Sequence, residues 1–161
     1  MKIIGRLIFV GIIFWEINIS MAQDMRSTAH FYTIRLKPQQ DLKAELVAFA
    51  KVNRMKAAFV ATCVGSLEQL NLRYANQQNG SQKLGHFEIV SLVGTFNENA
   101  AHLHLSVSDS TGQTFGGHLL DGNKVYTTAE IVIGELADVE FSRELDSTYG
   151  YQELKVKKRK E

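Results

Sequence analysis

The alternation of apolar and polar residues predicts several short strands. Residues 30–37 alternate as a half-buried strand does, and Pro38 ends this run. Residues 139–145 alternate more cleanly, with Phe141 and Arg143 on the same face. Other runs are rich in β-branched and aromatic residues and lie between turn signals. These runs span residues 57–67, 69–75, 86–96, 101–110, 115–120 and 125–136.

One segment, residues 41–55, has a helical period instead. Asp41 can accept a hydrogen bond at the N-cap position. Acidic residues come early in this segment and basic residues come late, as the helix dipole favours. The apolar residues at helical spacing are Leu42, Leu46, Phe49 and Ala50. This is the main helix that the pattern predicts.

The order of these elements indicates the fold class. Strands that follow each other so closely must pair mostly in the antiparallel sense, because a parallel crossover needs a dozen or more residues. We therefore predict an α+β domain in which one main helix packs against a largely antiparallel, curled sheet. The chain has 161 residues, no internal repeat and no linker, so a single domain is expected.

Composition excludes few functions. The chain is 45% hydrophobic and 22% charged with a net charge of +1, as in many soluble globular proteins. No overall field therefore draws it to nucleic acid or to an anionic membrane. Cys63 is the one cysteine, which excludes an intrachain disulfide, and its apolar neighbours suggest a small buried side chain.

The N-terminus, residues 1–22, is set apart from the predicted domain. Two basic residues precede an apolar stretch, and small residues then offer a cleavage point, as in a secretory signal peptide. The stretch is short for a stable membrane span. Alternatively, Met21 is the natural start and the preceding residues are an upstream extension. The protein would be secreted in the first case and cytoplasmic or nuclear in the second.

The C-terminal end, residues 155–161, is strongly basic. Such a run is commonly a solvated, disordered tail, and it also fits a nuclear-import or nucleic-acid patch. Both interpretations stay open from the sequence. The candidate nucleic-acid-binding residues are Lys155, Lys157, Lys158, Arg159 and Lys160.

The stretch His102–Leu119 holds three of the five histidines. Because side chains alternate along a strand, His102 and His104 should share a face, about 6 to 7 Å apart at the backbone. A tight turn around Gly112 would return the chain so that His104 lies opposite about Gly117 or His118. The three imidazoles would then converge.

Three histidines with an open fourth position are typical of catalytic zinc, so zinc is the expected metal. Glu130 and Glu88 are candidate acid–base partners by residue type, although spacing alone places neither near the histidines. The alternative is an amphipathic strand whose polar face happens to carry histidines. In that case the histidines would belong to a surface or to a subunit interface.

Several stretches together resemble one family, the plants-and-prokaryotes conserved (PPC) domain. The resemblance spans about Phe31 to Leu154 and defines a predicted domain at 29–154. Among members of that family, the chain is most similar to the free-standing prokaryotic ones. The stretches are IRLKPQQDLKAELVAFAKVN, GSLEQLNLRYAN, GHFEIVSLVGTF, HLHLSVSDSTGQTFGGHLLDGNKVYTTAEIVIGEL and FSRELDSTYGYQEL.

The resemblance implies an α+β fold that assembles as a homotrimer. In plants the domain is joined to AT-hook motifs that bind DNA, and it contacts transcription factors. The plant signature G-R-F-E-I-L stands here as Gly85–Val90, with His86 in place of the arginine. No AT-hook is present, so DNA binding is implied only weakly.

A more distant likeness concerns the histidines. The PPC fold is similar to that of acetolactate decarboxylase, a zinc enzyme that holds its metal with a His-x-His pair and a third histidine. His102, His104 and His118 match that pattern. Two hypotheses follow. One is a trimeric interaction module, acting in transcription regulation with protein partners or DNA; the other is a zinc-dependent lyase or hydrolase acting on a small carbonyl or carboxylate substrate.

Overall fold

The computed structural model describes residues 25–160, so the expectations for residues 1–22 lie outside the described residues. None of the helices within this range is long and apolar enough to span a membrane. The elements are β1 (Ala29–Leu36), α1 (Leu42–Val52), β2 (Ala58–Arg73), β3 (Ser81–Phe96), β4 (Ala101–Ser108), β5 (Thr114–Leu119), β6 (Lys124–Leu136), β7 (Val139–Leu145) and β8 (Gln152–Lys158).

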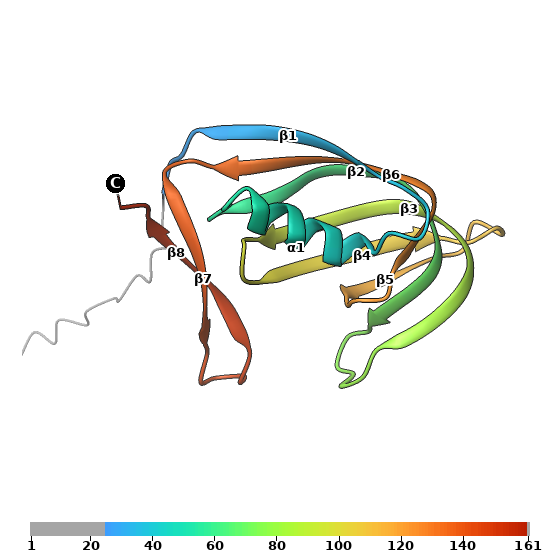
Figure 1. The fold of residues 1–161 in the computed structure, drawn as a ribbon. Coiled ribbons are helices and arrows are strands. Elements are labelled where there is room, and N and C mark those ends of the chain that lie inside the picture. Colours follow the sequence, from blue (N-terminus) through green and yellow to red (C-terminus); the bar gives the residue numbers. More distant parts are fainter. Residues whose placement is uncertain (1–24, 161) are drawn as a thin grey trace, which may run out of the picture.

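The main sheet has six strands in the order β1-β6-β2-β3-β4-β5 (Figure 1). Every neighbouring pair is antiparallel. The sheet curls far enough for the end of β5 to pair with the end of β2, where Arg73 lies opposite His118. The predicted α+β class with a curled antiparallel sheet is therefore confirmed. The two predicted runs at 57–67 and 69–75 form one strand, β2, with irregular register near Leu67.

The predicted helix is present but shorter than residues 41–55. Asp41 is the N-cap, and its side chain accepts from the backbone N–H of Ala44 at 3.0 Å. The helix ends at Val52, because Asn53 leaves helical geometry and Arg54 has a positive φ of 53°. Apolar spacing alone did not reveal this end.

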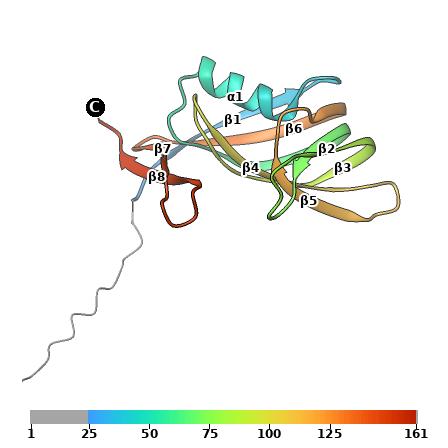
Figure 2. The same ribbon diagram turned by 90° about the horizontal axis from the view of Figure 1, so that it is seen from below.

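The core lies between α1 and the curled sheet, with α1 over one face (Figures 1 and 2). Leu42, Leu46 and Ala50 of α1 are fully buried there. Residues from all six strands of the main sheet meet them, including Leu103 and Leu105 of β4. This packing makes β4 a rigid support for side chains on its opposite face.

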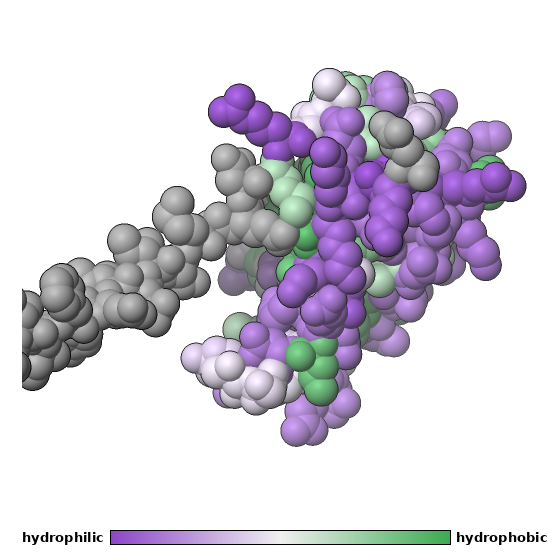
Figure 3. Space-filling view, turned by 90° about the vertical axis from the view of Figure 1, so that its left-hand side faces the viewer, coloured by the Kyte–Doolittle hydropathy of each residue, from purple (hydrophilic) through white to green (hydrophobic). Residues whose placement is uncertain are grey.

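The C-terminal segment corrects the prediction of a disordered tail from residue 155. Residues Gln152–Lys158 form β8, which pairs with β7 as a separate two-stranded sheet. The space-filling view of the side where this hairpin lies is mostly hydrophilic (Figure 3). A strand of alternating basic residues carries weak apolar periodicity, so sequence patterning missed it.

Two hydrogen bonds to the backbone of Phe141 attach β7 to residues that flank β2 and β3 of the main sheet. The N–H of Phe141 donates to the carbonyl of Lys56 at 3.0 Å, and Asn97 Nδ2 donates to the carbonyl of Phe141 at 2.8 Å. Because Asn97 follows β3 directly, these bonds hold β7 beside the start of β4. Arg143 thereby reaches the histidine stretch.

Candidate metal centre

The histidine hairpin forms as the sequence predicted. β4 and β5 pair with His104 directly opposite His118. Gly112 adopts a positive φ of 82° in the turn. Asp109 stabilises that turn by accepting from the N–H groups of Thr111 and Gln113 at 2.9 and 3.1 Å. The predicted register is confirmed.

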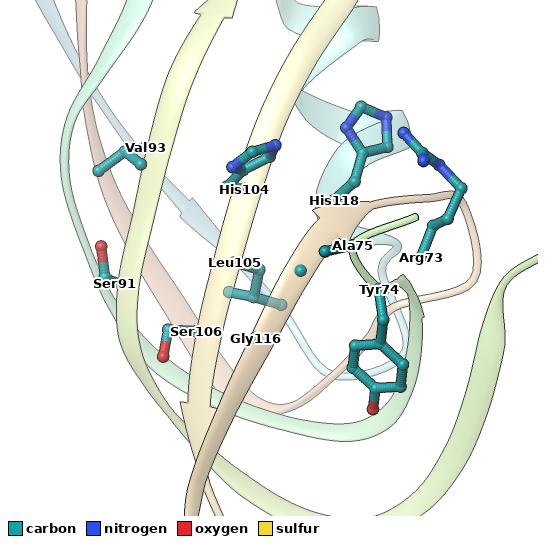
Figure 4. Close-up of a pocket in the computed structure, with 11 residues that line it drawn as sticks. Arg73, Tyr74, Ala75, Ser91, Val93, His104, Leu105, Ser106, Gly116 and His118 are labelled. Atoms are coloured by element: carbon teal, nitrogen blue, oxygen red, sulfur yellow. The ribbon is translucent and has the colours of Figure 1, made fainter. Parts of the chain in front are cut away.

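Because side chains alternate along β4, one face of the strand contributes to the core and the other carries the histidines. Leu103 and Leu105 are each 1% exposed and fill the core. His102 and His104 therefore project from the other face, where their Nε2 atoms are 3.2 Å apart. Figure 4 shows His104 beside His118, with the guanidinium of Arg73 next to His118.

One ring nitrogen from each of the three histidines lies within 4.8 Å of the other two. Nitrogens bound to one tetrahedral zinc at about 2.0 to 2.1 Å would be roughly 3.3 Å apart. The three side chains therefore need only small shifts to share one metal ion. The cluster offers three protein ligands, the number that leaves one tetrahedral position open.

The surroundings favour the neutral imidazole, which is the form that binds metal. Burial, together with the nearby His102 and Arg73, lowers the pKa of His118 to about 4. Burial also lowers the pKa of His102, with a further contribution from Arg143. Both rings are therefore unprotonated on one nitrogen at neutral pH.

One nitrogen of the cluster has no partner. Nδ1 of His118 is buried and makes no hydrogen bond with any described group. An unsatisfied buried polar atom costs about 1 to 3 kcal/mol. A metal ligated there would remove that cost, so the donor set fits zinc.

Glycines make the close strand approach possible. A Cβ on Gly117 would lie 2.8 Å from the carbonyl oxygen of Arg73, and one on Gly116 would lie 2.6 Å from that of Leu105. Side chains at either position would push β5 away from its neighbours. These glycines therefore leave room for β5 to approach both β4 and β2.

Two cavities of about 540 and 500 Å³ flank the cluster, and both are lined by Arg73 and His118. The second is also lined by residues of the β7–β8 hairpin, including Arg143 and Glu153. The sequence did not predict that Arg143 and Glu153 lie at this site. One pattern in the sequence could have indicated Arg143, because it shares a face of β7 with the apolar Phe141.

The structure corrects the expectation for the two candidate glutamates. Glu130 lies opposite Val64 on β2, nine positions from Arg73, which is opposite His118. Across the sheet, β2 and β3 lie between β6 and β4, so Glu130 is at least about 14 Å from the strand that carries His102 and His104. Glu88 lies opposite Ser108, four positions beyond His104 and about 13 Å away along β4. Neither lines a cavity at the histidines.

Three of the five basic C-terminal candidates lie within ion-pair distance of two acids of the same chain. Lys155 and Lys157 lie 3.5 and 3.4 Å from carboxylate oxygens of Glu144. Arg159 lies 3.8 Å from Glu135. The last two candidates, Lys158 and Lys160, line a small hollow beside Asp138. The run is therefore a weaker positive patch than its sequence suggests.

A curled antiparallel sheet that carries three convergent histidines on one hairpin defines a small α+β domain with a candidate metal centre. The sequence profile of the Plants and Prokaryotes Conserved (PCC) domain matches residues 23–137, and this chain belongs to that family. The β7–β8 hairpin lies beyond the matched range.

Solved structures agree with this fold. A hypothetical protein from Salmonella enterica is 44% identical, with a TM-score of 0.83 over 85% of this chain and 99% of that chain. A PPC protein from Pyrococcus horikoshii is 25% identical, with a TM-score of 0.66 over 82% and 95% of the two chains. A metal-containing protein from Archaeoglobus fulgidus is 21% identical, with a TM-score of 0.70 over 81% and 97%.

A longer relative contains a similar segment. The bifunctional protein GlmU of Synechococcus sp. (strain JA-3-3Ab) is 45% identical over 127 residues. The match covers 79% of this chain and 20% of that protein. The chain thus spans about a fifth of the length of this relative, which leaves the activity of GlmU outside the comparison.

Proposed function

We propose that this PPC-domain protein binds one zinc ion through His102, His104 and His118. The observation that supports this most is the convergence of three ring nitrogens within 4.8 Å on a rigid hairpin. The partnerless Nδ1 of His118 supports it independently. The similar fold of a metal-containing archaeal protein agrees with the proposal.

The first experiment measures metal in protein purified without chelators, by inductively coupled plasma mass spectrometry. We expect about one zinc per protomer in the wild type and less than about a tenth of that in His104→Ala. His30→Ala is the matched control, because His30 lies on β1 outside the cluster. A wild-type protein without bound transition metal would falsify the proposal.

An open coordination position also supports the alternative of a zinc-dependent lyase or hydrolase on a small carbonyl or carboxylate substrate. When bound, zinc polarises such oxygens and lowers the pKa of water to about 7. The two flanking cavities give a small molecule access to His104 and His118 from one side and to His102 and His118 from the other. Among residues 25–160, the second cavity is lined by one carboxylate, that of Glu153, and the first cavity by none. Glu153 therefore replaces the two earlier glutamates as the acid–base candidate.

We also propose that the protein acts as a homotrimer. Val64 and Val90 are each 55% exposed, although apolar side chains usually avoid water on a sheet. The register of β2 and β3, in which Ser66 lies opposite Glu88, puts these two valines opposite each other. Val93, opposite His104, extends the patch and is 53% exposed. Burial of this patch between protomers would remove apolar surface from water next to the metal centre.

DNA association and transcription regulation, which the plant members suggest, have less support. Lys155 and Lys157 of β8, two of the five candidate DNA-binding residues, share the carboxylate of Glu144. Binding to phosphates would have to compete with these pairs. We therefore place metal binding first.

A further inference from the structure

We propose that Arg73 and Arg143 form an anion-binding pair that holds the carboxylate of a small monoanionic ligand beside the histidines. This proposal adds a class of ligand to the metal site, and it rests on the proposed function in that the zinc ion would lie next to the carboxylate. One arginine comes from the end of β2 and the other from β7, and both line the same cavity.

Both guanidinium groups have unused donors. Arg73 uses one N–H, from Nη1 to the carbonyl of Gln77 at 3.3 Å. Arg143 uses two, to Nδ1 of His102 at 3.4 Å and to Oγ1 of Thr95 at 3.0 Å. Since a guanidinium has five N–H donors, most remain for a ligand.

Neither arginine has a carboxylate partner. Within residues 25–160 no acidic oxygen lies within 4.0 Å of either guanidinium. Other basic side chains, such as Lys157 and Arg159, do have such partners. Two unpaired guanidinium groups on one cavity produce a local positive field that an anion would neutralise.

The charge of the side chains that line the cavity favours an anion. Arg73 and Arg143 contribute two positive charges and Glu153 one negative charge, so the described side chains carry a net charge of +1. A phosphate dianion would meet repulsion from Glu153. A planar carboxylate also matches the fork of a guanidinium, which can bind both of its oxygens.

The size of the cavity sets the size of the ligand. Its volume of about 500 Å³ lies in the lower part of the range of small-molecule sites. The small side chains of Ala100 and Ala101 form part of its wall, and Tyr151 forms another part. A short-chain carboxylic acid fits this space, while a nucleic acid or a peptide segment would extend beyond it.

The test measures binding of L-lactate, acetate and inorganic phosphate by isothermal titration calorimetry, with zinc content determined for every sample. We expect saturable lactate binding that weakens at least tenfold in Arg143→Gln and in Arg73→Gln, because a charged hydrogen bond is worth about 1.5 to 3 kcal/mol. Arg35→Gln is the matched control, since Arg35 lies on β1 away from the cavity. Its affinity should equal that of the wild type.

Three results would contradict the anion-binding pair. The wild-type protein could bind neither lactate nor acetate, or both arginine variants could fold and bind lactate with wild-type affinity. The wild-type protein could also bind phosphate more tightly than lactate. The zinc measurement separates this inference from the metal proposal. Arginine-dependent lactate binding by protein that holds no metal would sustain the pair and contradict the zinc site.

Discussion

Cys63 lies on β2 and is 5% exposed. Burial raises the pKa of its thiol from 9.0 to about 12. We expect alkylation by iodoacetamide at pH 8 to be at least about a hundredfold slower in native protein than in denaturant, because the thiolate is the reactive form. Mass spectrometry over a time course gives both rates, and equal rates would contradict a buried thiol.

The same shift predicts how stability depends on pH. The folded protein holds the Cys63 proton more tightly than the unfolded chain, so this contribution is fully present below pH 9. It should be lost as the pH rises from about 9 to 12. A Cys63→Ala variant lacks the ionising group and supplies the comparison for this alkaline loss.

At the scale of single elements, the β3–β4 pair depends on Gly94. This residue has a φ of 138°, and a Cβ there would lie 2.1 Å from the carbonyl oxygen of His102. We expect Gly94→Ala to destabilise the protein by more than about 2 kcal/mol and to lower zinc content, because the clash displaces the strand that carries His102. Urea denaturation measures the first effect and metal analysis the second.

A comparison with Gly112 distinguishes the effect of the clash at Gly94 from the effect of backbone strain. Gly112 also has a positive φ, of 82°, but a Cβ there meets nothing within 4 Å. Gly112→Ala should therefore cost only about 1 kcal/mol and leave zinc content unchanged. If the two variants lose equal stability, the close approach at Gly94 is not the cause.

At the scale of the whole molecule, the exposed valines of β2 and β3 support self-association. We expect Val90→Lys to convert a trimer into protomers of 18.1 kDa, since a charge cannot be buried in an apolar interface without a partner. Sedimentation velocity measures the mass. Val52→Lys is the control, because Val52 is 83% exposed at the end of α1.

The control should sediment as the wild type does. A wild-type protein that is monomeric at micromolar concentration would contradict the homotrimer proposal. Wild-type mass in Val90→Lys would show instead that another surface joins the protomers.

Local patterns predicted the hairpin because its determinants lie close together in the chain. Gly112 allows the turn, alternation directs Leu103 and Leu105 inward, and the register of β4 and β5 follows from the turn. The predicted helix was correct at Asp41 but too long at its other end, where Arg54 leaves helical geometry. Ends of helices depend on contacts that periodicity does not report.

Contacts between residues far apart in the chain were not predictable from local patterns. Arg73 and His118 lie 45 positions apart and meet because β5 closes against β2. Arg143 reaches His102 because Asn97, in the loop after β3, donates a hydrogen bond to the carbonyl of Phe141 in β7. Glu130 and Glu88 were plausible partners by residue type, but the strand registers separate them from the cluster.

Local sequence patterns specify the class of fold, the main helix and the convergence of His102, His104 and His118. These depend on alternation, turn chemistry and helical spacing within short segments. The strand β8 and the positions of Arg73, Arg143 and Glu153 around the histidines follow instead from long-range packing. The reason is physical: the curl of the sheet and the docking of β7 depend on the packing of the whole core, which no single segment encodes.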